Sequence, residues 1–264
     1  MLIIGESLNA TRKSVHDAVI AQDVEFLQKL AVDQVNAGAM MLDVNAAVPN
    51  RKEEEDLPWM VEKVQEVVDV PLAIDSNNPD AIIAALAVHK GRPMINSISG
   101  EEEKLEKLLP IVTETDCDVI LLCMDDKGIP STIEGKVQIA GKVIELLLTK
   151  GKKIENVYVD PLIGTVATQT DAGVLAIETI KAIKKEFPGV HTAAGVSNIS
   201  YGMPARKLLN RIFLSLCISN GLDGCIVDSR DQELMSSIWA TMGLSGQDRF
   251  RSYMRAYKKG LLKG

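Results

Sequence analysis

The chain has few aromatic residues and no excess of positive charge. Aromatic side chains make up 4% of its 264 residues, which argues against the stacking platforms that bind single-stranded nucleic acid. Its formal net charge of -7 at pH 7 also argues against binding to a phosphate backbone. We therefore expect no nucleic acid among its partners.

Cysteine is also scarce, and the four cysteines form no Cys-x-x-Cys pair. Three of them stand in or beside apolar runs, a pattern typical of buried, reduced thiols. Reduced thiols predict a cytoplasmic location. The N-terminal residues lack a basic segment followed by a signal-like apolar run, and no stretch approaches the length of a membrane span. We expect neither a secretory signal nor a membrane anchor.

Several catalytic and cofactor motifs are missing. No His/Asp/Glu cluster has metal-ligand spacing, and no Cys–His or Ser–His arrangement indicates a nucleophile. The first apolar run is followed by Gly5-Glu6-Ser7-Leu8-Asn9, which lacks the glycine spacing of a dinucleotide-binding loop. The three histidines, at a helix start, a helix end and a strand start, are not placed to act as a base: His16, His89 and His191. We expect no metal bound by the protein.

Short apolar runs typical of buried parallel strands alternate with segments of helical spacing. The runs are Leu2–Gly5, Met40–Val44, Leu72–Ile74, Met94–Ile95, Val119–Met124, Val157–Val159, Ala193–Val196 and Gly224–Val227. The helical segments are Asp23–Asn36, Pro58–Val68, Pro79–Val88, Glu101–Thr113, Ile133–Thr149, Ala172–Phe187, Pro204–Asn220 and Gln232–Met242. This alternation, without a linker, predicts one domain over residues 1–264, a closed α/β (β/α)8 TIM barrel. An open doubly wound sheet is the alternative.

Two charged segments lie outside this alternation. The run Lys52–Asp56 predicts a solvated, acidic helix start, with Pro58 in the first helical turn. Residues 244–264 are basic and amphipathic, and we expect them to cap the barrel or to lie along an interface.

Polar residues follow the predicted strands at their carboxyl ends, where α/β barrels bind ligands. They are Glu6, Asp43, Asn45, Asp75, Asn96, Asp160, Ser197, Asn198 and Asp228. For a single residue such as Asp43 or Asp228, a helix cap or a loop brace is the more common explanation. As a set they offer carboxylates and amides without a lysine. Such a set suits a ligand with a donor-rich edge, such as the aminopyrimidinone ring of a pterin.

The order of these endings resembles a known family. Leu-Ile-Ile-Gly-Glu6, Leu-Asp43-Val-Asn45, Ile-Asp75-Ser, Met-Ile-Asn96-Ser, Tyr-Val-Asp160-Pro-Leu and Gly195-Val-Ser197-Asn198 occur in register along essentially the whole chain. They resemble the pterin-binding methyltransferases that move a methyl group between methyltetrahydrofolate and a corrinoid protein. The folate domain of cobalamin-dependent methionine synthase is a more distant match. The resemblance implies a TIM barrel and a homodimer.

The resemblance also implies residue roles. Asp75, Asn96 and Asp160 would hydrogen-bond the pterin ring, and Asn198 would lie near N5, which carries the methyl group. Ser197 and Arg206 match further positions near the folate, and Glu6 and Asp43 belong to the matching motifs. Arg206 is also compatible with a solvated helix arginine or with contact to the glutamate tail.

For the reaction, the resemblance implies attack of cob(I)alamin on the methyl carbon while N5 is stabilised by hydrogen bonding or protonation. Asn198 would hydrogen-bond N5, and Asp75 or Asp160 would order the proton-delivering network. The cobalamin would belong to a separate corrinoid protein, because no Asp-x-His-x-x-Gly motif is present.

Two other functions remain open. A dihydropteroate synthase shares the pterin barrel, but the segment Ser197-Asn198-Ile199-Ser200 lacks the lysine expected there in that family. A non-catalytic folate-binding subunit is the second, although binding alone would not require a group at N5.

Overall fold

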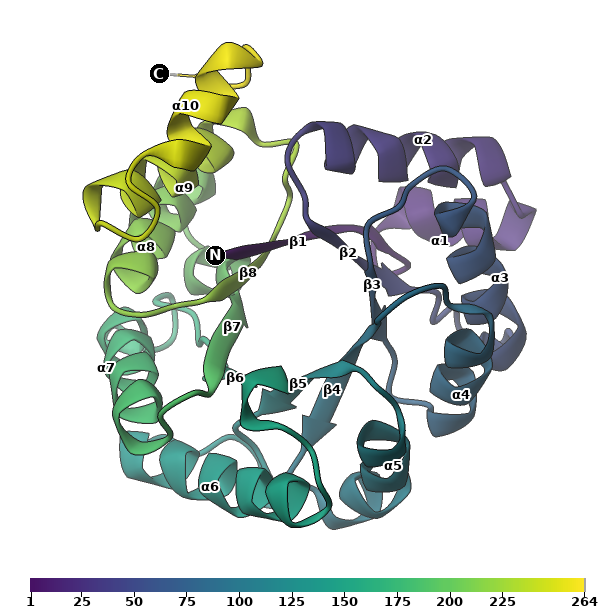
Figure 1. The fold of residues 1–264 in the computed structure, drawn as a ribbon, viewed down its shortest axis with the longest axis horizontal. Coiled ribbons are helices and arrows are strands. Elements are labelled where there is room, and N and C mark those ends of the chain that lie inside the picture. Colours follow the sequence, from purple (N-terminus) through teal and green to yellow (C-terminus); the bar gives the residue numbers. More distant parts are fainter. Residues whose placement is uncertain (264) are drawn as a thin grey trace.

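The computed structural model describes residues 1–263. Its strands close into a barrel in the order β1 to β8, and each neighbouring pair is parallel (Figure 1). The strands are β1 (Leu2–Asn9), β2 (Met41–Asn45), β3 (Leu72–Asp75), β4 (Met94–Ser99), β5 (Asp118–Leu122), β6 (Val157–Asp160), β7 (His191–Gly195) and β8 (Gly224–Val227). The predicted (β/α)8 barrel is confirmed, and the open sheet is excluded.

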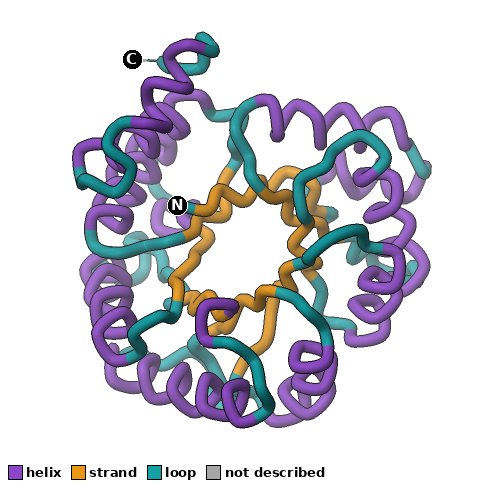
Figure 2. Tube along the Cα trace, in the orientation of Figure 1, coloured by secondary structure: helices purple, strands orange, loops and turns teal. Residues whose placement is uncertain are grey.

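Helices form the outer ring around the strands (Figure 2). They are α1 (Lys13–Ala21), α2 (Val24–Asn36), α3 (Glu53–Gln65), α4 (Pro79–Val88), α5 (Glu102–Glu114), α6 (Ile133–Thr149), α7 (Ala172–Glu186), α8 (Arg206–Ser219), α9 (Gln232–Leu244) and α10 (Arg251–Lys258), with short 3-10 turns η1 (Ile154–Asn156) and η2 (Val196–Ser200). Side chains cap several of them. Asp23 accepts a hydrogen bond from the Phe26 amide of α2, and Asp231 accepts one from the Leu234 amide of α9.

Three local expectations need correction. Helix α3 begins at Glu53, so Pro58 lies inside it rather than in its first turn. The predicted acidic start is present, but Asp56 is buried against Arg51 instead of solvated. Strand β1 continues to Asn9, well beyond the predicted end at Gly5, because Leu8 and Asn9 still pair with β2 after a register shift.

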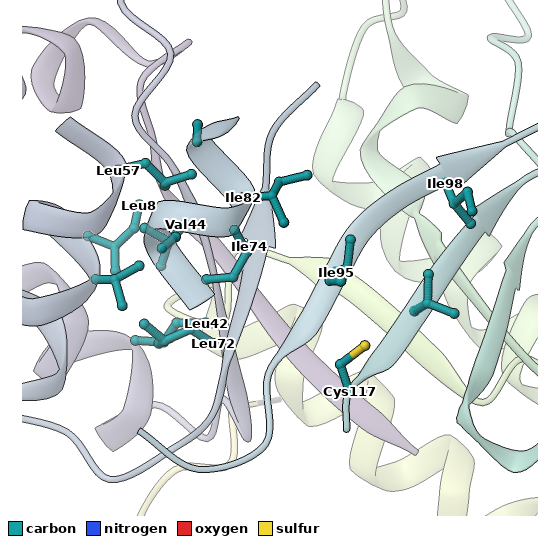
Figure 3. Packing of buried hydrophobic residues seen from close by; sticks show 14 of the residues in the cluster. Leu8, Leu42, Val44, Leu57, Leu72, Ile74, Ile82, Ile95, Ile98 and Cys117 are labelled. Carbon is teal, nitrogen blue, oxygen red and sulfur yellow. The ribbon is translucent and has the colours of Figure 1, made fainter. Parts of the chain in front are cut away.

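The core between strands and helices is apolar and close-packed. Figure 3 shows part of this core: the outward-facing Leu42, Leu72 and Ile74 belong to one cluster with Leu57 of α3 and Ile82 of α4, and all five are fully buried. Burial of a side chain of this size contributes about 1.5–3 kcal/mol. These contacts hold the strands in place and thereby fix the positions of their carboxyl ends.

The inside of the barrel changes from apolar to polar along strands β1 to β4, whereas β5 stays apolar up to Leu122. A buried layer contains Ile4, Met41, Ala73, Met94 and Ile120. Because side chains alternate between the two faces of a strand, the next inward residue comes two positions later. Those residues are Glu6, Asp43, Asp75, Asn96 and Leu122. The strand geometry therefore puts the polar set above an apolar floor, at the mouth of the barrel.

The C-terminal segment packs against the outside of the ring. Helix α10 lies beside α9 (Figure 1), and Ala256 is buried there, whereas Met254 and Tyr257 are exposed. Its role at an interface stays a prediction. All four cysteines are free and buried. Among residues 1–263, no helix combines the length and the apolarity that a bilayer crossing requires.

Candidate active site

Asp75 is the centre of a hydrogen-bonded cluster at the end of β3. The side-chain amide of Asn9 donates to Asp75 Oδ2 at 3.1 Å, and that of Asn45 donates to the same oxygen at 3.2 Å. Asn45 also donates to the backbone carbonyl of Asp75 at 3.1 Å. Asn96 is the register partner of Asp75 on β4. Residues from the ends of β1 and β2 thus orient a carboxylate on β3.

Asp43 lies below this cluster and is 3% exposed. It accepts a hydrogen bond from Asn96 Nδ2 at 2.9 Å. Burial, the neighbouring Asp75 and Glu6 hold the pKa of Asp43 well above its usual range, although the hydrogen bond from Asn96 lowers it. Burial likewise raises the pKa of Asp75 to about 6, against the hydrogen bonds from Asn45 and Asn9. Two close carboxyls in a desolvated site disfavour ionisation of both, and burial favours the protonated form of Asp43.

The raised pKa of Asp43 leads to a stability prediction. Asp43→Asn should unfold at nearly the parent temperature, because an amide has the shape of the protonated carboxyl that burial favours. Asp43→Ala should lose about 1–3 kcal/mol, since the buried Asn96 amide is left without its acceptor. Thermal unfolding at pH 7 compares the two variants. An Asn variant as unstable as the Ala variant would mean that Asp43 is ionised.

Asp160 ends β6 and is held by the loop that follows it. Its Oδ1 accepts a hydrogen bond from the Leu162 amide at 2.7 Å. Burial raises the pKa of Asp160 to about 6, opposed by the backbone amide of Leu162, the ammonium of Lys136 and the backbone amide of Gly195. At neutral pH it is largely an ionised carboxylate with little water around it. Such a group binds donors of a ligand more strongly than a solvated one does.

Asn198, Ser197 and Arg206 come together after β7. Asn198 is exposed in η2, and its side chain takes part in none of the hydrogen bonds found among residues 1–263. Arg206, at the start of α8, donates to the Ser197 carbonyl at 2.9 Å and to the Ser200 hydroxyl at 3.1 Å. Its guanidinium also lies 5.8 Å from the ring centre of Tyr201. Arg206 therefore braces the turn that carries Asn198, whose amide is available to a ligand.

Glu6 and Asp228 line a cavity of about 530 Å³ beside this turn, together with Ser197 and Arg206. Arg12 bridges the two carboxylates, at 2.6 Å from Glu6 and 3.6 Å from Asp228. Arg230 pairs with Asp228 at 3.0 Å and, against the effect of burial, holds the pKa of Asp228 below its usual range. Burial raises the pKa of Glu6 despite the nearby Arg12. The acids here have cationic partners, unlike Asp43 and Asp75.

The structure separates the predicted set into three neighbourhoods around the mouth. Asp43, Asp75 and Asn96 form the cluster of β2 to β4; Asp160 stands on β6; Glu6, Ser197, Arg206 and Asp228 line the cavity near β1, β7 and β8. No group of three or more His, Cys, Asp or Glu residues within 1–263 has the arrangement of a metal site.

Sequence reasoning missed two residues of this site. Asn9 was assigned to a loop, and its contact with Asp75 depends on the register shift in β1, which has no sequence signal. Lys136 is buried behind Asp160. The sequence does contain a signal for Lys136. It shares one face of α6 with the apolar Ala140, Val143 and Ile144, and a lysine on such a face indicates a buried charge.

Carboxylates and amides gather at the mouth of a parallel barrel, a set of groups that suits a ligand with a donor-rich edge such as a pterin. In agreement, a family model described as "Pterin binding enzyme" matches residues 5–228. This chain belongs to that family.

Similarity to individual proteins is more specific. The chain is 35% identical over 263 residues to the methylcorrinoid:tetrahydrofolate methyltransferase of Eubacterium limosum, a match that covers 98% of this chain and 97% of that protein. It is 32% identical over 240 residues to the methionine synthase of Mycobacterium leprae, covering 86% of this chain and 20% of that longer protein. The predicted resemblance to the pterin-binding methyltransferases is confirmed.

Solved structures of dihydropteroate synthase share the fold. The enzyme of Xanthomonas albilineans with 4-aminobenzoic acid matches with a TM-score of 0.70 at 18% identity, over 93% of this chain and 91% of that one. The enzyme of Clostridium difficile with pteroic acid matches with a TM-score of 0.73 at 20% identity, over 92% and 96%. At these identities the likeness extends to the fold alone.

Proposed function

We propose that this protein transfers a methyl group between N5 of methyltetrahydrofolate and the cobalt of a corrinoid carried by a separate protein. The observation that carries the proposal is the exposed Asn198 after β7, at the same end of the barrel as the desolvated Asp75 and Asp160, in a chain similar along its whole length to a methylcorrinoid:tetrahydrofolate methyltransferase.

The desolvated carboxylates account for recognition of the pterin. A pterin offers a ring N–H and an exocyclic amine side by side, and an ionised carboxylate accepts from both. Asp160 has one oxygen engaged by Leu162 and retains acceptor capacity for such a pair. Asp75 and Asn96 are neighbours across β3 and β4 and supply further polar contacts to the same ring system. Ser197 and Arg206 complete the folate site on the β7 side.

Asn198 accounts for activation of the methyl group. A tertiary amine is a poor leaving group, so charge developing at N5 must be neutralised as the methyl departs. Asn198 cannot give up a proton at neutral pH, but its amide can hydrogen-bond N5 and favour the protonated form in the transition state. Proton delivery then falls to water or to a network ordered by Asp75 or Asp160.

The corrinoid is proposed to arrive bound to its own protein. That protein would dock over the open mouth of the barrel, transiently enough to leave after transfer. The described residues supply the folate side of the reaction, and the corrinoid supplies the nucleophile or the methyl donor, depending on direction.

Folate binding tests the proposal without the corrinoid. Isothermal titration of the purified protein with methyltetrahydrofolate should show one site per chain. The protein should form no dihydropteroate from a dihydropterin pyrophosphate and 4-aminobenzoate, since no lysine follows β7 within Ser197–Ser200. Absence of folate binding would refute the proposal. Formation of dihydropteroate would instead assign the site to the synthase reaction.

We also propose that the protein is a homodimer. Helix α8 carries three apolar side chains at four-residue spacing, Leu208, Ile212 and Leu216, that are 51%, 53% and 48% exposed. A stripe of this kind on one helix face is typical of an interface between copies of a chain. The four free, buried cysteines support the further proposal of a reducing, cytoplasmic location.

The stripe on α8 gives a second prediction. Ile212→Lys should convert the dimer to a monomer, because a charge placed in a small apolar contact must be desolvated on association. Ile83→Lys is the matched control, since Ile83 is 52% exposed on the distant helix α4. Sedimentation of both variants measures the effect. A monomeric parent protein would refute the dimer, and a dimeric Ile212→Lys would place the interface elsewhere.

A further inference from the structure

Lys136 is a buried lysine behind the candidate site. It belongs to the first turns of α6 and is 3% exposed. Its Nζ donates to the backbone carbonyl of Pro161 at 2.7 Å and to that of Leu162 at 3.0 Å. Fully buried lysines are rare unless their charge is compensated, so this one needs an explanation.

The two carbonyls belong to the loop that holds Asp160. The Leu162 amide donates to Asp160 Oδ1, and the Leu162 carbonyl accepts a hydrogen bond from Lys136 Nζ. The carboxylate and the ammonium thus both bind the backbone of one residue, one at its N–H and the other at its carbonyl. Leu162 has a φ of 54°, in the left-handed region that a leucine rarely adopts. A backbone of this kind persists only when surrounding contacts maintain it. Lys136 supplies two of those contacts.

Lys136 also acts on the charge of Asp160. The groups that face Asp160 are Lys136 from α6, the Cys123 thiol beyond the end of β5, and the backbone amides of Leu162 and Gly195. Burial raises the pKa of Cys123 to about 12, so the thiol is neutral at pH 7. The ammonium of Lys136 is therefore the cation that favours ionisation of Asp160.

We propose that Lys136 is a positioning residue for folate: it locks the Pro161–Leu162 turn so that Asp160 faces the ligand, and its charge keeps that carboxylate ionised. This inference rests on the proposed function, because it takes Asp160 as a pterin contact. Lys136 itself is buried beneath the Pro161–Leu162 turn and does not contact the ligand.

The chain contains a matched control for this role. Lys152 is 6% exposed and also donates to backbone carbonyls, those of Val112 at 2.9 Å and Thr115 at 3.3 Å. Val112 lies in the last turn of α5, and Thr115 directly follows that helix. Both residues are on the side of the barrel where β5 begins, and neither belongs to the site. Lys136→Met and Lys152→Met each remove one buried ammonium with similar side-chain volume. Only the first removes it from behind Asp160.

The test compares folate affinity of the full-length variants between pH 5 and pH 8, with thermal unfolding measured in parallel. Lys136→Met should bind methyltetrahydrofolate about tenfold more weakly at pH 7, because the unbraced turn no longer holds Asp160 toward the ligand and about one hydrogen bond's contribution to binding is lost. The pH below which binding is lost should rise by about one unit, since Asp160 loses its facing cation. Lys152→Met should keep the parent affinity and the parent pH profile, whatever it loses in thermal stability.

A double variant distinguishes an effect of Lys136 through Asp160 from a loss of folate affinity caused by general destabilisation of the protein. In an Asp160→Asn background, Lys136→Met should add no more than a small further loss, because both changes act through the same carboxylate. The proposal is overturned if Lys136→Met binds folate with the parent affinity and pH profile. It is also overturned if Lys136→Met causes the same loss of folate affinity in the Asp160→Asn background as in the parent protein.

If Lys136→Met does not fold, Lys136→Gln removes the charge and keeps a hydrogen-bond donor. The proposal then predicts the same pH shift for Lys136→Gln. A parent protein that does not bind folate refutes the proposed function before either variant is compared.

Discussion

Replacing Asn198 with alanine is expected to slow methyl transfer about 10²–10³-fold, while affinity for methyltetrahydrofolate stays within a few-fold of the parent value. The asymmetry follows from where the amide acts. In the resting protein the Asn198 side chain is exposed and takes part in none of the hydrogen bonds found among residues 1–263, so its loss disturbs no packed structure. Its hydrogen bond to N5 strengthens as the methyl leaves, and an interaction made mainly in the transition state changes the rate rather than binding.

Single-turnover transfer measured beside equilibrium folate binding separates these two effects. Asn77→Ala is the matched control, because Asn77 is an exposed asparagine in the loop after β3, outside the carboxylate cluster. It should transfer at the parent rate. If Asn198→Ala also transferred at the parent rate, the role assigned to Asn198 at N5 would be wrong.

Asp160→Asn is expected to have opposite effects on binding and on stability. Folate affinity should fall about 10–100-fold, since hydrogen bonds to a charged group contribute about 1.5–3 kcal/mol. The ligand-free protein should become more stable at pH 7.5. The pKa of Asp160 is about 6 in the folded chain and 3.8 for a free aspartate, so ionisation above pH 6 opposes folding by up to about 3 kcal/mol.

The stability difference between Asp160→Asn and the parent protein depends on pH, because the pKa of Asp160 is raised in the folded state. As the pH falls through 6 towards 4, the folded parent takes up the proton, and the penalty from Asp160 disappears. The gain in unfolding temperature of Asp160→Asn should therefore be largest near pH 7.5 and should vanish near pH 4. Asp118→Asn is the control for binding, because Asp118 begins β5, far from the carboxyl end that carries the site. A variant that bound folate like the parent would remove Asp160 from the pterin contacts.

Sequence reasoning predicted the barrel and the positions of the polar strand ends at its mouth, because both depend on short-range patterns. Apolar runs such as Val157–Val159 identify buried strands, and a polar residue directly after such a run, like Asp160, must lie at the mouth once the strands are parallel. The resemblance then supplied roles for Asp75, Asn96 and Asn198 that composition alone could not give.

The internal arrangement of the site could not be predicted in the same way. The contact of Asn9 with Asp75 requires β1 to run past Gly5 with a shift in register, which is decided by pairing with β2. The raised pKa of Asp43 depends on burial and on the proximity of Asp75, and both are tertiary properties. Pro58 lies in a later turn of α3 than expected, because the helix begins at Glu53, within the acidic run, rather than at the proline.

Transfer of the methyl group to free cobalamin tests the central claim most directly. Purified protein, methyltetrahydrofolate and chemically reduced cob(I)alamin are mixed without oxygen, and the visible spectrum is followed. Protein-dependent loss of the cob(I)alamin band with appearance of methylcobalamin is the predicted result, and it should be slowed in Asn198→Ala. A protein that binds methyltetrahydrofolate yet transfers no methyl group, either to cob(I)alamin or to any reduced corrinoid protein supplied, would contradict the account and leave a folate-binding subunit.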